Sequence, residues 1–131
     1  MKNYIQNWYD KLNSRTSIRI KHTSVVEGIS DKHLGPRIEY AKVVFECTPS
    51  DEFEVDFGKF QSRTNEFELL FLEAAISGFI DIAMLNEPHP LRCVHLKIVH
   101  VDFDEMNASE IAFRHAGQDA AKKVLESMKF N

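Results

Sequence analysis

Residues 108–116 read Ala-Ser-Glu-Ile-Ala-Phe-Arg-His-Ala and directly follow an alternating, strand-like segment. Either Asn107 or Ser109 can cap a helix at this point, because a short polar side chain accepts a hydrogen bond from the first turn. Glu110 follows in the positively polarised first turn, where a carboxylate is favourable. The junction therefore predicts a helix over 109–128 that begins where a strand has just ended.

Working outward from this junction, four segments alternate apolar and polar residues with the period of a strand. We expect strands over 15–28, 37–49 and 53–57 and a fourth around 94–98, with 30–36 as turn residues. The expected inward side chains are Ile18, Ile20, Ala41, Val43, Phe45, Cys47, Phe53, Val55, Phe57, Val94, Leu96 and Ile98. Polar residues on the opposite side predict a sheet with one solvated face.

A second long helix is predicted from Thr64 or Asn65 to Leu85, with acidic residues in its first turn. Its apolar residues cover more than half of the circumference, so it should be largely buried in the fold or against another subunit. A short helix is expected over 4–13, within an N-terminal helical extension (1–14) of one domain spanning 1–131. The predicted order β-β-β-α-β-α gives an α+β two-layer sandwich, with two helices on one face of a four-stranded sheet.

Several segments resemble the fourth domain of elongation factor G and elongation factor 2, which are translational GTPases. Residues 37–49 (Arg-Ile-Glu-Tyr-Ala-Lys-Val-Val-Phe-Glu-Cys-Thr-Pro) are similar to that domain's Arg-Gly-Gln-Tyr-Gly-His-Val-Val-Ile-Asp-Met-Tyr-Pro strand. Residues 26–28 resemble the end of the strand before it, and 96–98 its Val-Lys-Val. Residues 108–116 are similar to the Ser-Ser-Glu-Met-Ala-Phe-Lys that opens its last helix. Together these matches cover roughly residues 15–127 in a consistent order.

The resemblance implies a ribosomal protein S5 domain 2-like fold in a bacterial, cytoplasmic, translation-factor-like domain. It implies a non-catalytic protein whose partner is the ribosome or a structured RNA. The segment 32–37 (Lys-His-Leu-Gly-Pro-Arg) occupies the place of a tip loop that approaches tRNA and mRNA in the family. The implied contact residues are Lys32, His33, Arg37 and Lys42, supported by Arg19 and Lys21. An ordinary polar turn with Gly-Pro chemistry is the alternative interpretation of this segment.

The chain departs from the family pattern at both tip loops. Ile38 replaces a glycine of the first loop, and 101–108 lacks the family's histidine while carrying three acids. Because acids repel a phosphate backbone, these changes favour a second hypothesis. In that hypothesis the fold is kept as a self-associating or protein-interaction module, a homo-oligomer formed through the helix over 67–85.

Charge is distributed unevenly within the net value of −4. Residues 1–50 carry eight Lys/Arg against five acids, 51–110 carry four against thirteen, and 111–131 carry four against two. A dedicated nucleic-acid protein is usually basic over its binding face, so any such surface here is a local patch. The outward sheet residues are expected to form exposed charge pairs of small energetic value. We expect no secretory signal and no membrane-spanning segment.

No residue pattern of an enzyme was found in the sequence. The chain has no Gly-x-x-x-x-Gly-Lys-Ser/Thr motif, so GTP hydrolysis by a P-loop is excluded, and we expect no cofactor. His100, Asp102 and Asp104 alternate near Glu105, but their spacing matches no zinc or calcium site, so we expect solvated acids and no metal. Two cysteines, Cys47 and Cys93, are too few for a disulfide framework, and we expect reduced, buried thiols.

Overall fold

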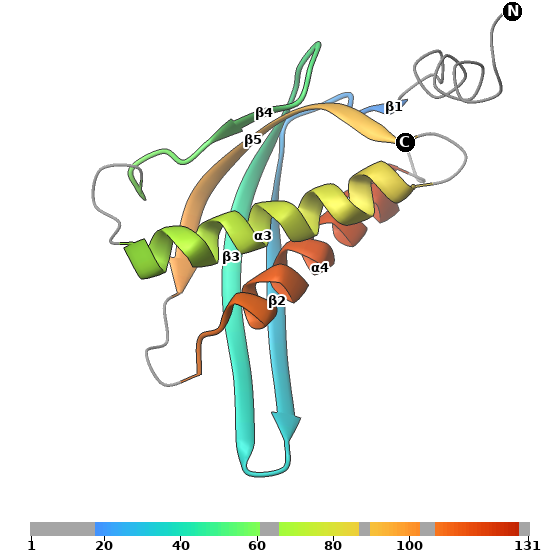
Figure 1. The fold of residues 1–131 in the computed structure, drawn as a ribbon. Coiled ribbons are helices and arrows are strands. Elements are labelled where there is room, and N and C mark those ends of the chain that lie inside the picture. Colours follow the sequence, from blue (N-terminus) through green and yellow to red (C-terminus); the bar gives the residue numbers. More distant parts are fainter. Residues whose placement is uncertain (1–17, 61–65, 87–89, 103–106, 129–131) are drawn as a thin grey trace, which may run out of the picture.

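The computed structural model describes residues 18–60, 66–86, 90–102 and 107–128. Two helices cover one face of a mixed β-sheet (Figure 1). The elements along the chain are β1 (Ile18–Arg19), β2 (Ser24–Leu34), β3 (Arg37–Pro49), β4 (Glu54–Asp56), α3 (Glu66–Leu85), β5 (Leu91–Asp102) and α4 (Glu110–Met128). The predicted α+β two-layer sandwich is therefore confirmed.

The sheet is built around β5 and β3, which run antiparallel in its centre. β2 pairs antiparallel with the outer side of β3, from Ser24 opposite Cys47 to Leu34 opposite Arg37. β4 and the two-residue β1 both pair parallel with β5. Helix α3 connects β4 to β5, so these elements form a β-α-β crossover. β2 stands at the end of the strand order β1-β5-β3-β2 and is therefore an edge strand. It is also the strand on which α4 packs most extensively.

The single strand expected over 15–28 is wrong. Residues 18–19 belong to β1 beside β5, whereas β2 begins only at Ser24 on the far edge of the sheet. Ile20 is buried in the core between them, and the exposed Lys21 starts the bend that separates the two strands. The alternation of apolar and polar residues does not reveal this break, because residues 18–19 and 24–28 both have the two-residue period of a strand.

The turn expected over 30–36 is also wrong, because β2 continues to Leu34 and only Gly35 and Pro36 form the turn. Gly35 has a φ of 65°, the sign required at the first central residue of a type II′ hairpin turn. Polar residues in this segment resemble a loop in sequence, but cross-strand pairing with β3 holds them extended.

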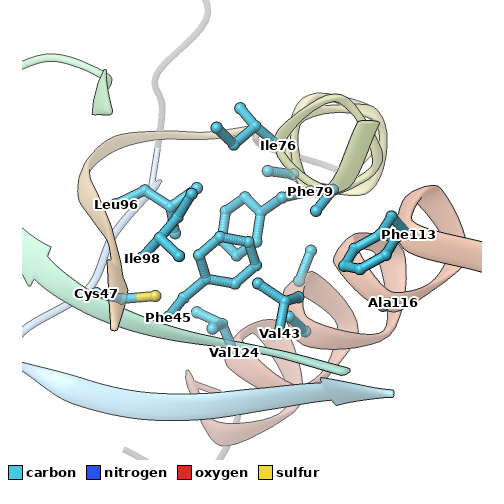
Figure 2. Packing of buried hydrophobic residues seen from close by; sticks show 14 of the residues in the cluster. Val43, Phe45, Cys47, Ile76, Phe79, Leu96, Ile98, Phe113, Ala116 and Val124 are labelled. Carbon is cyan, nitrogen blue, oxygen red and sulfur yellow. The ribbon is translucent and has the colours of Figure 1, made fainter. Parts of the chain in front are cut away.

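The core lies between the inner sheet face and both helices (Figure 2). Predicted inward residues that are buried are Ile20, Ala41, Val43, Phe45, Cys47, Val94, Leu96 and Ile98. Phe45 meets Phe79 of α3 edge-on, with ring centroids 5.7 Å apart. Val55 departs from the prediction, since it is 36% exposed on the short edge strand β4. A register shift between Val44 and Phe45 in the β3–β5 pairing lets β5 continue to Asp102, beyond the predicted segment.

Both helices were located closely from sequence. Ser109 caps α4, its Oγ accepting a hydrogen bond from the backbone N–H of Ala112 at 3.0 Å. Helix α3 is less covered than expected, because Leu69, Leu70 and Leu85 are 37%, 46% and 74% exposed. No helix among the described residues is long and apolar enough to cross a membrane. The expected helix over 4–13 and the capping residues 64–65 lie outside the described residues.

Helix α4 approaches both α3 and β2 at glycines. A Cβ at Gly117 of α4 would lie 1.8 Å from the carbonyl oxygen of Ala75 in α3. A Cβ at Gly28 of β2 would lie 2.0 Å from the carbonyl oxygen of Ala116. Backbone therefore packs directly on backbone where α4 crosses its two neighbours, and this fixes α4 tightly against the edge strand.

Candidate functional site

The β2–β3 hairpin extends well past the helical layer and forms a two-stranded projection (Figure 1). Continuous pairing as far as Leu34 and Arg37 holds the projection straight. A backbone hydrogen bond from Tyr40 N–H to the carbonyl oxygen of Asn107, 3.2 Å long, joins its base to the segment before α4. The paired strands β2 and β3 thus hold the residues near the turn away from the core.

Lys32 and His33 lie in this projection and are exposed. Since successive strand residues point to opposite faces, they have different neighbours. Lys32 Nζ lies 3.2 Å from Nδ1 of His115 on α4. His33 Nε2 lies 3.6 Å from a carboxylate oxygen of Asp31. The two basic side chains therefore do not form one continuous surface.

The remaining predicted contact residues are spread along the molecule. The backbone of Arg37 lies at the turn beside Lys32 and His33, opposite Leu34. Lys42 lies farther from the turn in β3, and its Nζ atom is 3.4 Å from a carboxylate oxygen of Glu27 in β2.

Arg19 and Lys21 lie at the other end of the sheet, since Arg19 pairs with Cys93 and β2 starts only after Lys21. The 11 residues of β2, from Ser24 to Leu34, separate the two ends by roughly 34 Å. The structure thus places Lys32, His33 and the backbone of Arg37 near the turn, with the Lys32 and His33 side chains on opposite faces, and leaves Arg19 and Lys21 distant.

A cleft of about 320 Å³ opens between β2 and α4, at the base of the projection. Its lining comes from both elements: Ile29, Ser30, Asp31, Lys32, His115, Gln118, Asp119 and Lys122. The α4 residues recur at intervals of three or four, which places them on one side of the helix. Two lysines from different elements thus line the same hollow.

Hydrogen bonds beside this cleft cover part of the free edge of β2. Asp119 accepts a hydrogen bond from the backbone N–H of Ile29 at 3.1 Å. Lys123 Nζ lies 3.0 Å from the same Asp119 oxygen and donates to the carbonyl oxygen of Glu27 at 2.8 Å. An edge strand with unpaired backbone groups is prone to association, and these side chains satisfy two of those groups.

Ser30, in the wall of the cleft, is an exception to the rule that buried polar groups form hydrogen bonds. Its side chain faces the helical layer and it is only 3% exposed. Among the described residues, its Oγ has no hydrogen-bond partner. A buried hydroxyl in this state costs free energy, and such a group in a native fold calls for a specific reason.

The outer face of the sheet carries charge pairs, as expected. His95 Nδ1 lies 2.9 Å from a carboxylate oxygen of Glu54, and His100 Nε2 lies 2.9 Å from one of Asp102. No group of three His, Cys, Asp or Glu side chains suited to a metal occurs in the part of the chain that the structure describes. Asp104 and Glu105 lie outside that part.

Both cysteines are buried thiols, as predicted. Burial, with a smaller effect of the neighbouring Glu46 carboxylate, raises the pKa of the Cys47 thiol to about 12. Cys93 Sγ donates to the carbonyl oxygen of Asp51 at 3.6 Å. Cys47 is therefore a protonated core thiol at neutral pH and has no nucleophilic character there.

Sequence reasoning identified Lys32 but missed His115, Gln118 and Lys122. A usable signal was present, because polar residues at 115, 118, 119 and 122 share one side of a helix whose other side is apolar. The net positive charge of residues 111–131 pointed to the same element. Which strand this side would face depends on how the helix packs.

Comparison with known proteins gives similarity of fold. No family model matches the chain, and no curated protein matches its sequence. Among the 57 matching chains of solved structures is a protein from Thermus thermophilus, with 23% sequence identity and a TM-score of 0.66. The match covers 82% of this chain but only 16% of that one. This protein therefore shares its fold with a domain-sized part of a much longer protein.

Proposed function

We propose that this protein is a non-catalytic domain that binds the ribosome or a structured RNA through the β2–β3 hairpin. The carrying observation is that the hairpin extends beyond the helical layer with Lys32 and His33 exposed near its end. The resemblance of 37–49 and 108–116 to the fourth domain of elongation factor G supports this proposal. In that family the corresponding tip approaches tRNA and mRNA.

The chemistry of the tip suits phosphate contact. Lys and Arg side chains bind phosphate oxygens, and a long two-stranded support lets them reach into a concave RNA surface. Because each phosphate contact releases counterions, binding should weaken as salt rises. The basic residues near the turn are Lys32, His33 and Arg37, so few phosphate contacts can form. We therefore expect the binding affinity to fall only gradually as the salt concentration rises.

Salt-dependent cosedimentation with ribosomes tests the proposal. We expect wild-type protein to pellet with ribosomes at low salt and the His33→Ala/Arg37→Ala variant to remain in the supernatant. Lys59→Ala is the matched control, because Lys59 is an exposed lysine outside the projection. Equal pelleting of wild type and the double variant, or of neither, would contradict the proposal.

A second candidate function, self-association, is favoured by the exposed leucines of α3. Leu69, Leu70 and Leu85 leave apolar surface uncovered in the described chain. Such surface is typical of an interface between subunits. Light scattering over a range of concentrations tests it: a dimer that Leu70→Glu dissociates would support it, and a strict monomer would exclude it.

A further inference from the structure

We infer that the cleft between β2 and α4 is a binding site for a phosphate group. This site shares Lys32 with the hairpin, but its other lining residues lie at the base of the projection on β2 and on α4, so the inference holds whether or not the end of the hairpin binds RNA. The phosphate can belong to a nucleic acid or to a small phosphorylated molecule, because both present the same oxygen atoms.

Cationic groups enter the cleft from two elements. Lys32 comes from β2 and Lys122 from α4, and both line the hollow of about 320 Å³. Lys122 is exposed and stands one helical turn from Gln118, whose amide adds a neutral donor. Lysine ammonium groups on facing elements are an arrangement suited to a small anion.

The two carboxylates in the lining are directed to other partners. Asp119 is bonded to the backbone N–H of Ile29 and lies 3.0 Å from Lys123. Asp31 lies 3.6 Å from His33. Asp119 is paired with Lys123, and Asp31 is directed to the strand face opposite Lys32, so the charges of Lys32 and Lys122 are left to act on a ligand.

His115 supplies a further donor through its tautomer. The Lys32 ammonium can only donate, so the Nδ1 atom 3.2 Å away accepts with its lone pair. The ring proton of neutral His115 is then on Nε2, which becomes an N–H donor. A bound oxyanion would accept a hydrogen bond from this group.

NMR titration of the ¹⁵N-labelled full chain with inorganic phosphate tests the site, with sodium chloride used to hold the ionic strength constant. We expect chemical-shift changes centred on Ser30, Lys32, His115 and Lys122. Lys122→Gln should weaken binding by about tenfold, the contribution of one charge-assisted hydrogen bond. Lys59→Gln, which removes an equal charge elsewhere, should bind phosphate like wild type.

Three further measurements separate the sources of phosphate and the two proposals. A short RNA with a 5′-phosphate that binds more tightly than its 5′-hydroxyl form would support a terminal phosphate, and equal affinity would support backbone phosphates. Arg37→Ala should leave the phosphate titration unchanged, so loss of ribosome binding alone would not count against the cleft. Unperturbed cleft resonances with all three probes, or equal affinity in Lys122→Gln and wild type, would overturn the inference.

Discussion

At the scale of single residues, Ser30 is a position where a buried polar group opposes stability. The hydroxyl is buried without a partner among the described residues, so removing it should help the fold. We predict that Ser30→Ala raises the free energy of unfolding by about 1 kcal/mol, the lower part of the range for an unsatisfied buried polar group. Urea denaturation measures this. A loss of stability would mean that the hydroxyl has a structural partner.

Cys47 provides a residue-scale prediction about pH. Its pKa rises from 9.0 to about 12 on folding, chiefly because burial disfavours the thiolate. The contribution of this thiol to stability is fully present below pH 9 and decreases as pH rises toward 12, since the unfolded chain releases the proton first. Denaturation midpoints of wild type and Cys47→Ala should therefore converge as the pH is raised above 9. In native protein at neutral pH, Cys47 should resist a thiol reagent that modifies it in urea.

At the scale of elements, the close crossing of α3 and α4 depends on a glycine at the contact, because glycine has no side chain. Alanine normally favours a helix over glycine by up to about 1 kcal/mol. At Gly117, however, the added methyl would lie 1.8 Å from the backbone of Ala75, and no rotamer change can relieve that contact. We predict that Gly117→Ala lowers the free energy of unfolding by at least about 2 kcal/mol, as expected of an overpacked interface.

The control for this prediction is Ser77→Ala, an exposed position of α3. It should change stability by no more than about 0.5 kcal/mol. Thermal or urea unfolding of both variants distinguishes a close contact from a general sensitivity of the helix. A neutral Gly117→Ala would show that the helices can separate at little cost.

At the scale of the whole molecule, the core and the projection should be separable. Lys32 and Glu39 lie opposite each other, so a two-residue Asn-Gly turn can join them in place of 33–38 without changing the register. We predict that this shortened chain keeps its free energy of unfolding within about 1 kcal/mol, because none of the removed residues with described side chains belongs to the core. It should no longer pellet with ribosomes.

The phosphate titration provides the complementary measurement on the same molecule. The shortened hairpin retains Ser30, Lys32 and the whole of α4, so inorganic phosphate should still perturb the cleft. Ribosome binding by the shortened chain would contradict a role for the projection. Loss of the fold would contradict the division of the molecule into core and projection.

Much of the architecture could be inferred from local pattern. Burial of alternate residues in 41–47 and 94–98 follows from the two-residue period of a strand, and Ser109 identifies the start of α4. The errors in predicting the strands occur where the local sequence pattern carries no information about which strands pair. Polar residues of 30–34 resemble a loop until β3 is seen beside them, and the alternation of 15–28 does not reveal a change of strand partner.

The sequence by itself determined the composition of each layer, the ends of its helices and the presence of basic residues near the Gly35-Pro36 turn. Only the tertiary structure decided which of these residues meet. His115 and Lys122 become neighbours of Lys32 because Gly28 lets α4 approach the edge strand closely. Periodicity records which side of an element is buried, whereas a site made by two elements depends on contacts between residues more than eighty positions apart.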